Sequence, residues 1–403
     1  MTYHRASPSR RALLGGASAL FAWNFMPRFA QAAGGRDPRF VVIILRGALD
    51  GLTAVPPIGD LSYKELRQSI ALSMDGPHPA LRLDGFFALD PSMPNFARLY
   101  HAKQAAVVHA CATAYRDRSH FDGQDVLESG YPSPGHVESG WLNRLLVTLP
   151  KGEKVPAGAG ALAVGANAPL VIRGKAPVLG WAPATLKPAE GELSQRLMDL
   201  YAHTDPLFSR LLTEGIETGK IASGMDVKSR GGPGDPNGME QMATGAARLL
   251  AEPTGPRIAA LAFEGWDTHA QELGRLSRLL TGLDNSFAAF ERELGPAWKD
   301  TVIIAVTEFG RTARINGTQG TDHGTGTAMF LAGGAVRGGR VIADWPGLKQ
   351  GQLRDGRDLA AITDMRAVIK GVAVDLLGAS PALLGRDVFP GSEAAAPMKG
   401  LIV

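Results

Sequence analysis

The stretch Phe40-Val41-Val42-Ile43-Ile44-Leu45, followed by Arg46-Gly47-Ala48-Leu49-Asp50-Gly51, decides the fold of this chain. Its first half is a short, continuously apolar run rich in β-branched residues, which is typical of a strand buried on both faces of a parallel sheet. Its second half is a glycine-flanked turn that carries one acidic residue. We therefore expect a buried parallel strand with Asp50 just beyond its carboxyl end.

Further runs of the same kind follow at 105–110, 257–263, 301–307 and 327–331. From Leu273 to Phe290, leucine and phenylalanine recur at helical spacing, which predicts one long amphipathic crossover helix. The alternation of strand, helix and strand indicates the α/β class, with a doubly wound, mostly parallel sheet flanked by helices.

The segment 152–256 is less regular and rich in glycine, proline and alanine. We expect it to be an insertion that caps the sheet and shapes an entrance. A helical pattern runs from Leu193 to Leu212, and a long loop is expected around Gly231. The remainder of residues 33–403 is expected to form one α/β domain.

The first 32 residues have the features of an export signal. Arg10 and Arg11 stand just ahead of the apolar stretch 13–25, and Ala30-Gln31-Ala32 is a small-x-small cleavage site. The arginine pair directs such a signal to the twin-arginine route. We expect the twin-arginine translocase to deliver a mature chain starting at Ala33 to the periplasm. The alternatives are a membrane anchor or a basic tail, and no later stretch has the length and apolarity of a membrane span.

Charge and cysteine content narrow the possible functions. The chain holds 42 basic and 39 acidic residues, but four arginines and no acid lie in residues 1–32, which leaves 38 basic against 39 acidic residues. A net charge of about −1 gives no electrostatic indication of a nucleic-acid partner. Cys111 is the only cysteine, so the chain cannot form an intrachain disulfide.

Acidic and histidine side chains stand next to the ends of the predicted strands. Asp50 follows the first strand, Ser119-His120 the second and Asp267-Thr268-His269 the third, Glu308 ends the fourth, and Asp322-His323 precedes the fifth. Because ligands of open α/β sheets bind beyond the carboxyl ends of the strands, we expect these side chains to meet at one edge. Carboxylate and imidazole sets suit zinc, manganese or a similar divalent ion. The candidate metal ligands are Asp50, Asp267, His269, Glu308, Asp322 and His323.

Structural alternatives stay open for most of these side chains: a turn residue at Asp50, a helix cap with a solvated histidine at 267–269, an ion pair with Arg311 at Glu308, and a helix cap at Ser119. Asp322-His323 is the sharpest signal, because an acid–histidine pair between glycines and ahead of a buried strand has few structural uses. His109, inside the second strand, is expected to be a core histidine with a satisfied hydrogen bond.

A series of motifs resembles, in order, those of the family called domain of unknown function 1501. The motifs are Leu45-Arg46-Gly47-Ala48-Leu49-Asp50-Gly51-Leu52, Arg118-Ser119-His120-Phe121, Ser139-Gly140-Trp141-Leu142, Gly265-Trp266-Asp267-Thr268-His269, Thr307-Glu308-Phe309-Gly310-Arg311 and Gly320-Thr321-Asp322-His323-Gly324. The stretch 358–366 is similar to the closing helix motif. The resemblance covers nearly the whole mature chain, and the family is grouped with the alkaline-phosphatase and sulfatase superfamily.

That resemblance implies an alkaline-phosphatase-like fold and a metal-dependent hydrolase of phosphate or sulfate esters, small or polysaccharide, with one or two divalent ions. Ser119 stands in the place of the nucleophile. Asp50, the pair Asp267 and His269, and His323 helped by Asp322 match metal ligands. Arg311 or Arg46 would offset charge on the transferred group.

The sequence departs from the superfamily pattern after the fourth strand. Glu308-Phe309 stands where Asp-His is usual, so one imidazole ligand is missing. This departure favours an alternative function, a non-catalytic periplasmic protein that binds carbohydrate or envelope and keeps at most a structural metal. An oxidoreductase is a third possibility, but no Gly-x-Gly-x-x-Gly follows the first strand and no cysteine cluster is present.

Overall fold

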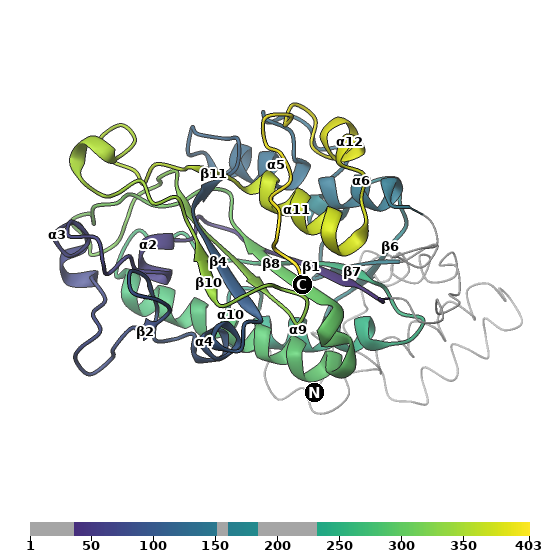
Figure 1. Ribbon diagram of the computed structural model, residues 1–403, viewed down its shortest axis with the longest axis horizontal. Coiled ribbons are helices and arrows are strands. Elements are labelled where there is room, and N and C mark those ends of the chain that lie inside the picture. The colour runs from purple at the N-terminus through teal and green to yellow at the C-terminus, as the bar shows by residue number, and fades with distance from the viewer. Residues whose placement is uncertain (1–35, 151–159, 184–231) are drawn as a thin grey trace, which may run out of the picture.

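The structure, a computed structural model, describes residues 36–150, 160–183 and 232–403 (Figure 1). The export signal expected at 1–32 and the helical pattern at 193–212 lie outside these residues, so both stay predictions. None of the helices in the described ranges is long and apolar enough to cross a membrane.

A nine-stranded sheet forms the centre of the protein. Its order is β10 (Arg340–Ile342), β4 (Ala105–Ala112), β9 (Thr327–Ala332), β8 (Thr301–Val306), β1 (Arg39–Leu45), β7 (Ile258–Phe263), β5 (Ala161–Val164) and β6 (Val178–Trp181), and β11 (Thr363–Asp364) also pairs with β4. Strand β9 runs antiparallel to β4 and β8, whereas the other strand pairs of this sheet are parallel. The predicted mostly parallel α/β sheet is confirmed.

The position of β1 in the sheet explains why its sequence is apolar from Phe40 to Leu45. It lies between the parallel strands β7 and β8, and all seven of its residues are buried. Val41, Ile43 and Leu45 belong to one hydrophobic cluster, while the alternate residues of the strand belong to another. Because both faces of the strand pack against side chains, the positions from Phe40 to Leu45 favour apolar residues.

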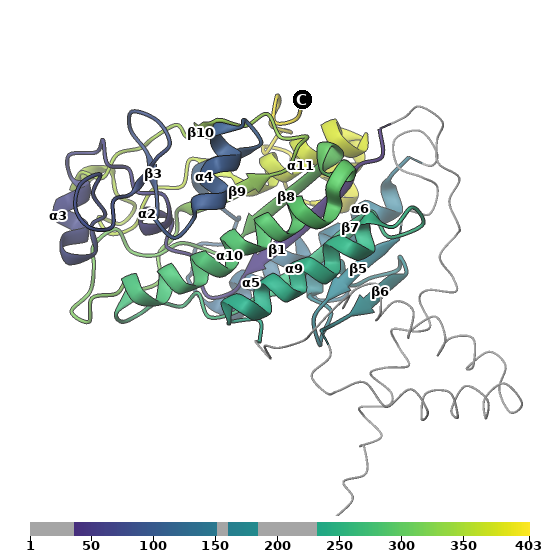
Figure 2. The same ribbon diagram turned by 90° about the horizontal axis from the view of Figure 1, so that it is seen from below.

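Helices cover both faces of the sheet. One face carries α4 (Pro94–His101), α9 (Pro236–Ala251) and α10 (Glu272–Leu294), and α9 and α10 run side by side along it (Figure 2). The other face carries α5 (His120–Ser129), α6 (Trp141–Thr148) and α11 (Met365–Leu377). Helix α10 is the crossover helix that the leucine spacing predicted. The shorter elements are α2 (Gly51–Ala54), α3 (Tyr63–Arg67), α12 (Pro381–Leu383) and a separate hairpin-like pair, β2 (Leu81–Arg82) and β3 (Ala88–Leu89).

The described part of the segment 152–256 differs from the expected cap. Strand β5 pairs with β7, and β6 pairs with β5, both in parallel, so this part extends the main sheet. Helix α9 packs on α10 beneath the same sheet. Strands β5 and β6 have only four residues each, and glycine and proline around them hide their pattern in the sequence. Residues 184–231 lie outside the described part.

Candidate metal centre

The topology brings the chemically interesting segments to one edge of the sheet. Strands β1, β4, β7 and β8 point their carboxyl ends the same way, and β9, which is antiparallel, begins at that edge. His120 opens α5 after β4, the segment 267–269 follows β7, Glu308 follows β8, and His323 precedes β9. The shared edge predicted from the strand ends is therefore present.

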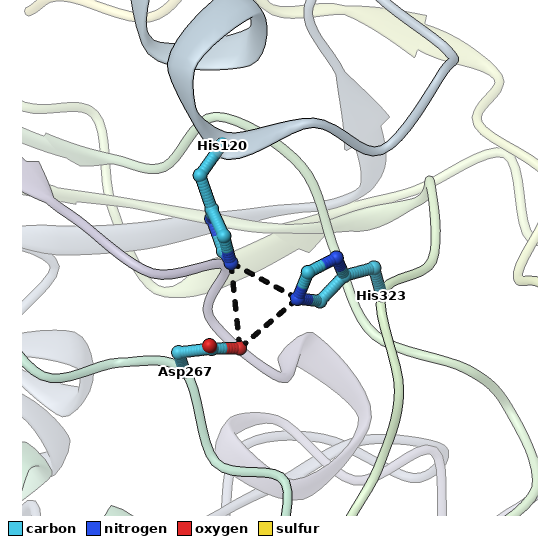
Figure 3. Close-up of side chains that lie close together, drawn as sticks. All are labelled: His120, Asp267 and His323. Carbon is cyan, nitrogen blue, oxygen red and sulfur yellow. Dashed lines mark hydrogen bonds and ion pairs between the residues drawn. The ribbon is translucent and has the colours of Figure 1, made fainter.

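Three imidazole rings and one carboxylate converge at this edge, and Figure 3 shows His120, Asp267 and His323. The Nε2 atom of His323 lies 2.9 Å from Nε2 of His120 and 3.0 Å from Nε2 of His269. Oδ1 of Asp267 lies 3.0 Å from Nε2 of His269, 3.2 Å from Nε2 of His323 and 3.4 Å from Nε2 of His120. Histidines from three separate segments thus direct the same ring nitrogen at one point.

The opposite nitrogen of each ring has an oxygen partner. Nδ1 of His120 lies 2.9 Å from Oε1 of Glu308, Nδ1 of His269 lies 3.2 Å from Oδ1 of Asp322, and Nδ1 of His323 lies 3.0 Å from the backbone carbonyl of Arg118. These partners accept hydrogen bonds from Nδ1–H and so leave an Nε2 lone pair free on each ring. Three lone pairs and a carboxylate that face one another repel unless a cation lies between them.

The spacing fits a metal ion. A tetrahedral zinc site with ligands at 2.0–2.1 Å has its ligand atoms about 3.3 Å apart. The ligand atoms of His120, Asp267 and His323 lie within 4.8 Å of one another, and Nε2 of His269 lies 3.0 Å from both Oδ1 of Asp267 and Nε2 of His323. His120, Asp267 and His323 could hold one divalent ion, and His269, which lies beside two of them, is a further candidate ligand.

Glu308 and Asp322 stand behind the histidines. Oε1 of Glu308 also accepts hydrogen bonds from the backbone N–H of Gly47 at 2.9 Å and from the Gln124 amide at 3.2 Å. Burial by itself would raise the pKa of Glu308, but the hydrogen bonds, led by that of His120, bring it below its usual value. The same hydrogen bond raises the pKa of His120. Glu308 therefore orients a ligand, and its partner is His120 rather than Arg311.

Arg311 holds the carboxylate ligand in place. Its wholly buried guanidinium donates to Oδ1 of Asp267, to the carbonyl of Thr321 and, at 3.2 Å, to Oγ1 of Thr321. Burial acts to raise the pKa of Asp267, but the hydrogen bond and charge of Arg311 outweigh it and the pKa falls. Asp267 is accordingly kept as a carboxylate that faces the imidazoles.

Asp50 lies in a separate buried cluster. Its Oδ1 accepts from the backbone N–H groups of Leu52 at 2.9 Å and Thr53 at 3.2 Å and so caps α2, which is the turn-residue alternative. Its Oδ2 is ion-paired with Arg67. The structure gives Asp50 no contact with the three histidines.

Ser119 and Arg46 lie beside the centre without joining it. Ser119 is the N-cap residue of α5, but its hydroxyl makes no capping hydrogen bond, and its backbone N–H donates to the hydroxyl of Tyr115 at 3.3 Å. Arg46 pairs with Glu128 at 2.7 Å and with Glu264 at 3.5 Å.

His120 was absent from the ligands inferred from the sequence. It stands directly after Ser119. Because the motif was interpreted as a nucleophilic or capping serine at the start of a helix, His120 was not considered as a ligand. The signal that could have revealed it is its position, because it follows a buried strand just as Asp267 and Glu308 do. His109 lies in the core as expected, with Nε2 2.9 Å from the carbonyl of Val55.

The chain was compared with known proteins. No curated protein matches it. Ps i-CgsB in complex with k-i-k-neocarrahexaose is similar with a TM-score of 0.37 and 11% identity over 73% of this chain and 65% of that one, so this chain spans less than two thirds of its length. A protein in the alkaline phosphatase superfamily from Vibrio parahaemolyticus has a TM-score of 0.35 and 10% identity over 80% and 69% of the two chains. The PsFucS1 sulfatase from Pseudoalteromonas sp. has a TM-score of 0.36 and 12% identity over 83% and 68%.

The chain also matches a family. The sequence profile described as Protein of unknown function (DUF1501) matches residues 37–372, from the start of β1 into α11, and so includes every side chain of the metal centre. This range covers the greater part of the chain. The protein therefore belongs to the DUF1501 family.

Proposed function

We propose that this protein is an exported, metal-dependent hydrolase of phosphate or sulfate esters. The observation that carries the proposal is the convergence of three Nε2 atoms on Asp267 at the carboxyl edge of the sheet. The side chains of His269 and Asp267 are 45% and 41% exposed, so a substrate could approach the centre from solvent. The nitrogen-rich ligand set suits zinc, with manganese as the other candidate.

The chain's own residues suggest how an ester would react. A divalent ion held by His120, His269, His323 and Asp267 would act as a Lewis acid toward an ester oxygen. Ser119 would supply the nucleophile: its Oγ loses its proton and bonds to phosphorus or sulfur, the bond to the leaving oxygen breaks and that oxygen gains a proton to leave as the alcohol, and water later cleaves the serine ester to restore the hydroxyl and release phosphate or sulfate. The free N–H groups at the start of α5 favour an anionic group there.

Export and substrate class complete the proposal. The arginine pair at Arg10-Arg11 and the cleavage site at 30–32 support delivery to the periplasm by the twin-arginine translocase. The substrate is a small-molecule or polysaccharide ester.

The test uses the mature protein loaded with Zn²⁺ or Mn²⁺ and a panel of aryl phosphates and aryl sulfates. Ser119→Ala should abolish turnover while the metal content stays the same. Ser133→Ala, which alters an exposed serine, is the matched control and should keep full activity. No turnover on any ester, or equal activity of Ser119→Ala and wild type, would contradict the proposal.

The number of protein ligands also suits a second function, that of a non-catalytic binding protein with a structural metal ion. Four protein ligands fill the shell of a tetrahedral ion, which is typical of structural sites. A non-catalytic protein that binds carbohydrate or envelope would hold its ion tightly, show no turnover, and bind isolated polysaccharide in a way that Ser119→Ala leaves unchanged.

A further inference from the structure

A buried ionic cluster lies next to the metal centre and is made of Asp50, Arg67 and Glu272. All three side chains are at most 1% exposed. Nη2 of Arg67 is ion-paired with Oδ2 of Asp50 and lies 3.4 Å from Oε1 of Glu272. Oγ1 of Thr53 lies 3.3 Å from the Asp50 oxygen and 3.1 Å from the same Glu272 oxygen. One guanidinium group therefore stands between two buried carboxylates.

The guanidinium of Arg67 is fixed from its other side as well. Its Nη1 lies 3.2 Å from the carbonyl of Thr312 and 3.4 Å from that of Ala313. Among the described residues, Arg67 is the only basic side chain paired with Asp50 or Glu272. Burying these carboxylates without a cation would be costly. Since an arginine stays protonated, the cluster has a permanent cation of its own.

A divalent ion does not fit in this cluster. It would have to lie about 2.0–2.2 Å from the carboxylate oxygens, and Nη2 of Arg67 already lies against the Asp50 oxygen such an ion would use. The resemblance to two-metal hydrolases implied an ion held by Asp50. The side chains around Asp50 disagree with that implication.

A second observation points the same way. The ring of Phe309, which stands where the superfamily pattern has a histidine, is 1% exposed and stacks on the ring of His120 with 5.0 Å between centroids. It also lies 5.4 Å from the ring of His323. A Cβ atom on Gly123 would come within 3.0 Å of it, so this ring is closely packed. An apolar side chain thus fills that flank of the centre and offers no ligand.

The ionic cluster is joined to the metal centre by hydrogen bonds. Oγ1 of Thr321 donates to Oε2 of Glu272 at 2.6 Å and accepts from Nε of Arg311 at 3.2 Å. Arg311 in turn donates to Asp267. The charge of Arg67 is therefore part of the same network that positions the carboxylate ligand.

We infer that this protein has a one-ion centre, in which the guanidinium of Arg67 supplies at Asp50 the positive charge that a second metal ion would supply. The inference rests on the proposed function only in taking His120, Asp267, His269 and His323 as metal ligands. It assigns Asp50 and Glu272 to the binding of an arginine and not of a metal.

The test is the metal stoichiometry of the wild-type mature protein after incubation with excess Zn²⁺ and removal of free ion, measured by elemental analysis. We expect one ion per chain. In protein loaded with Mn²⁺, electron paramagnetic resonance should show an isolated ion without exchange coupling. Two ions per chain, or a coupled pair of manganese ions, would overturn the inference.

Two variants identify which residues hold the ion. Asp50→Asn should keep one ion per chain, whereas His323→Ala should lose it. If Asp50→Asn does not fold, which circular dichroism will show, the wild-type stoichiometry and resonance spectrum still decide. One ion without ester turnover would support this inference and contradict the proposed hydrolase. Two ions with ester turnover would contradict this inference and support the proposed hydrolase. A protein that binds no ion would overturn both.

Discussion

The hydrogen bonds behind the ligands decide what each imidazole can do. His120, His269 and His323 each use Nδ1 for an oxygen acceptor, so that Nε2 faces the centre. Burial above all, with the charge of Arg311, lowers the pKa of His323 and so favours the neutral ring that a metal ion would need. Without these acceptors either nitrogen could carry the proton, and the rings would not present matched lone pairs.

Glu308→Gln tests this arrangement at a single residue. The variant keeps the size of the side chain but removes the charge that accepts from Nδ1 of His120. We expect metal affinity to fall about 10- to 100-fold, as for other residues that support a ligand. Competition with a chromophoric chelator measures the change. Glu138→Gln, at an exposed position, is the control, and equal affinities of both variants would mean that Glu308 does not support the ligand.

His109 provides a pH-dependent prediction away from the centre. It is wholly buried, and burial lowers its pKa to about 4 from 6.5. Below pH 6.5 His109 binds a proton in the unfolded chain but stays neutral in the folded chain. The free energy of unfolding therefore falls as the pH drops from 6.5 to 4. A shift of this size corresponds to at most about 3 kcal/mol. Urea unfolding across this range should show a shallower loss for His109→Gln than for wild type, with His78→Gln as the control.

At the scale of elements, the loop between β8 and β9 determines how closely the ligands approach one another. A Cβ atom on Gly320 would lie 2.3 Å from the backbone of His269, and one on Gly324 would lie 2.3 Å from the carbonyl of Arg311. These contacts are with backbone, which cannot move aside as a flexible side chain would. Gly320 therefore lets this loop pack against the segment that carries His269, and Gly324 lets the two halves of the loop approach each other at Arg311 and His323.

Gly324→Ala should consequently weaken the centre more than the fold. The added methyl group pushes the loop away from Arg311 and displaces His323, so we expect at least a tenfold loss of metal affinity with a small fall in melting temperature. Gly317→Ala, in the same loop but with open space around it, is the matched control. Metal affinities that match the wild type in both variants would mean that the close approach is not required.

At the scale of the whole molecule, the sequence allowed the sheet to be predicted better than the site. The runs at 40–45, 105–110, 257–263, 301–307 and 327–331 became β1, β4, β7, β8 and β9, because long buried strands carry a strong apolar pattern. The edge at which the ligands meet followed from strand direction. The direct ligands could not be told from their supports, because Glu308 and His120 both follow strands and only the side-chain orientation separates them.

The role of Arg67 could not be predicted from the residues at the strand ends. It lies in a short helix, α3, far from any strand terminus, and nothing in its local sequence points toward Asp50. Only the tertiary packing brings its guanidinium between Asp50 and Glu272. The short strands β5 and β6 were missed for a similar reason, since the pairing of β5 with β7 and of β6 with β5, rather than their own composition, makes them strands.

Metal removal is the prediction that belongs to the whole protein. An ion that binds the folded state alone stabilises it, by about 4 kcal/mol when free metal exceeds the dissociation constant a thousandfold. Dialysis against a chelator should therefore lower the melting temperature by several degrees, and Zn²⁺ should restore it. His323→Ala should show the lower melting temperature with and without Zn²⁺, and a metal-dependent shift in that variant would mean the ion binds elsewhere.

The distance along the chain between the ligands has a consequence for biogenesis. His120 and His323 are 203 positions apart, and they lie beyond the paired strands β4 and β9, respectively. A ribosome that has released the chain only as far as β8 has produced His120, Asp267 and His269 but not the last histidine. Binding of an ion by the complete ligand set would thus be a late event, because it would require a chain whose translation has passed His323.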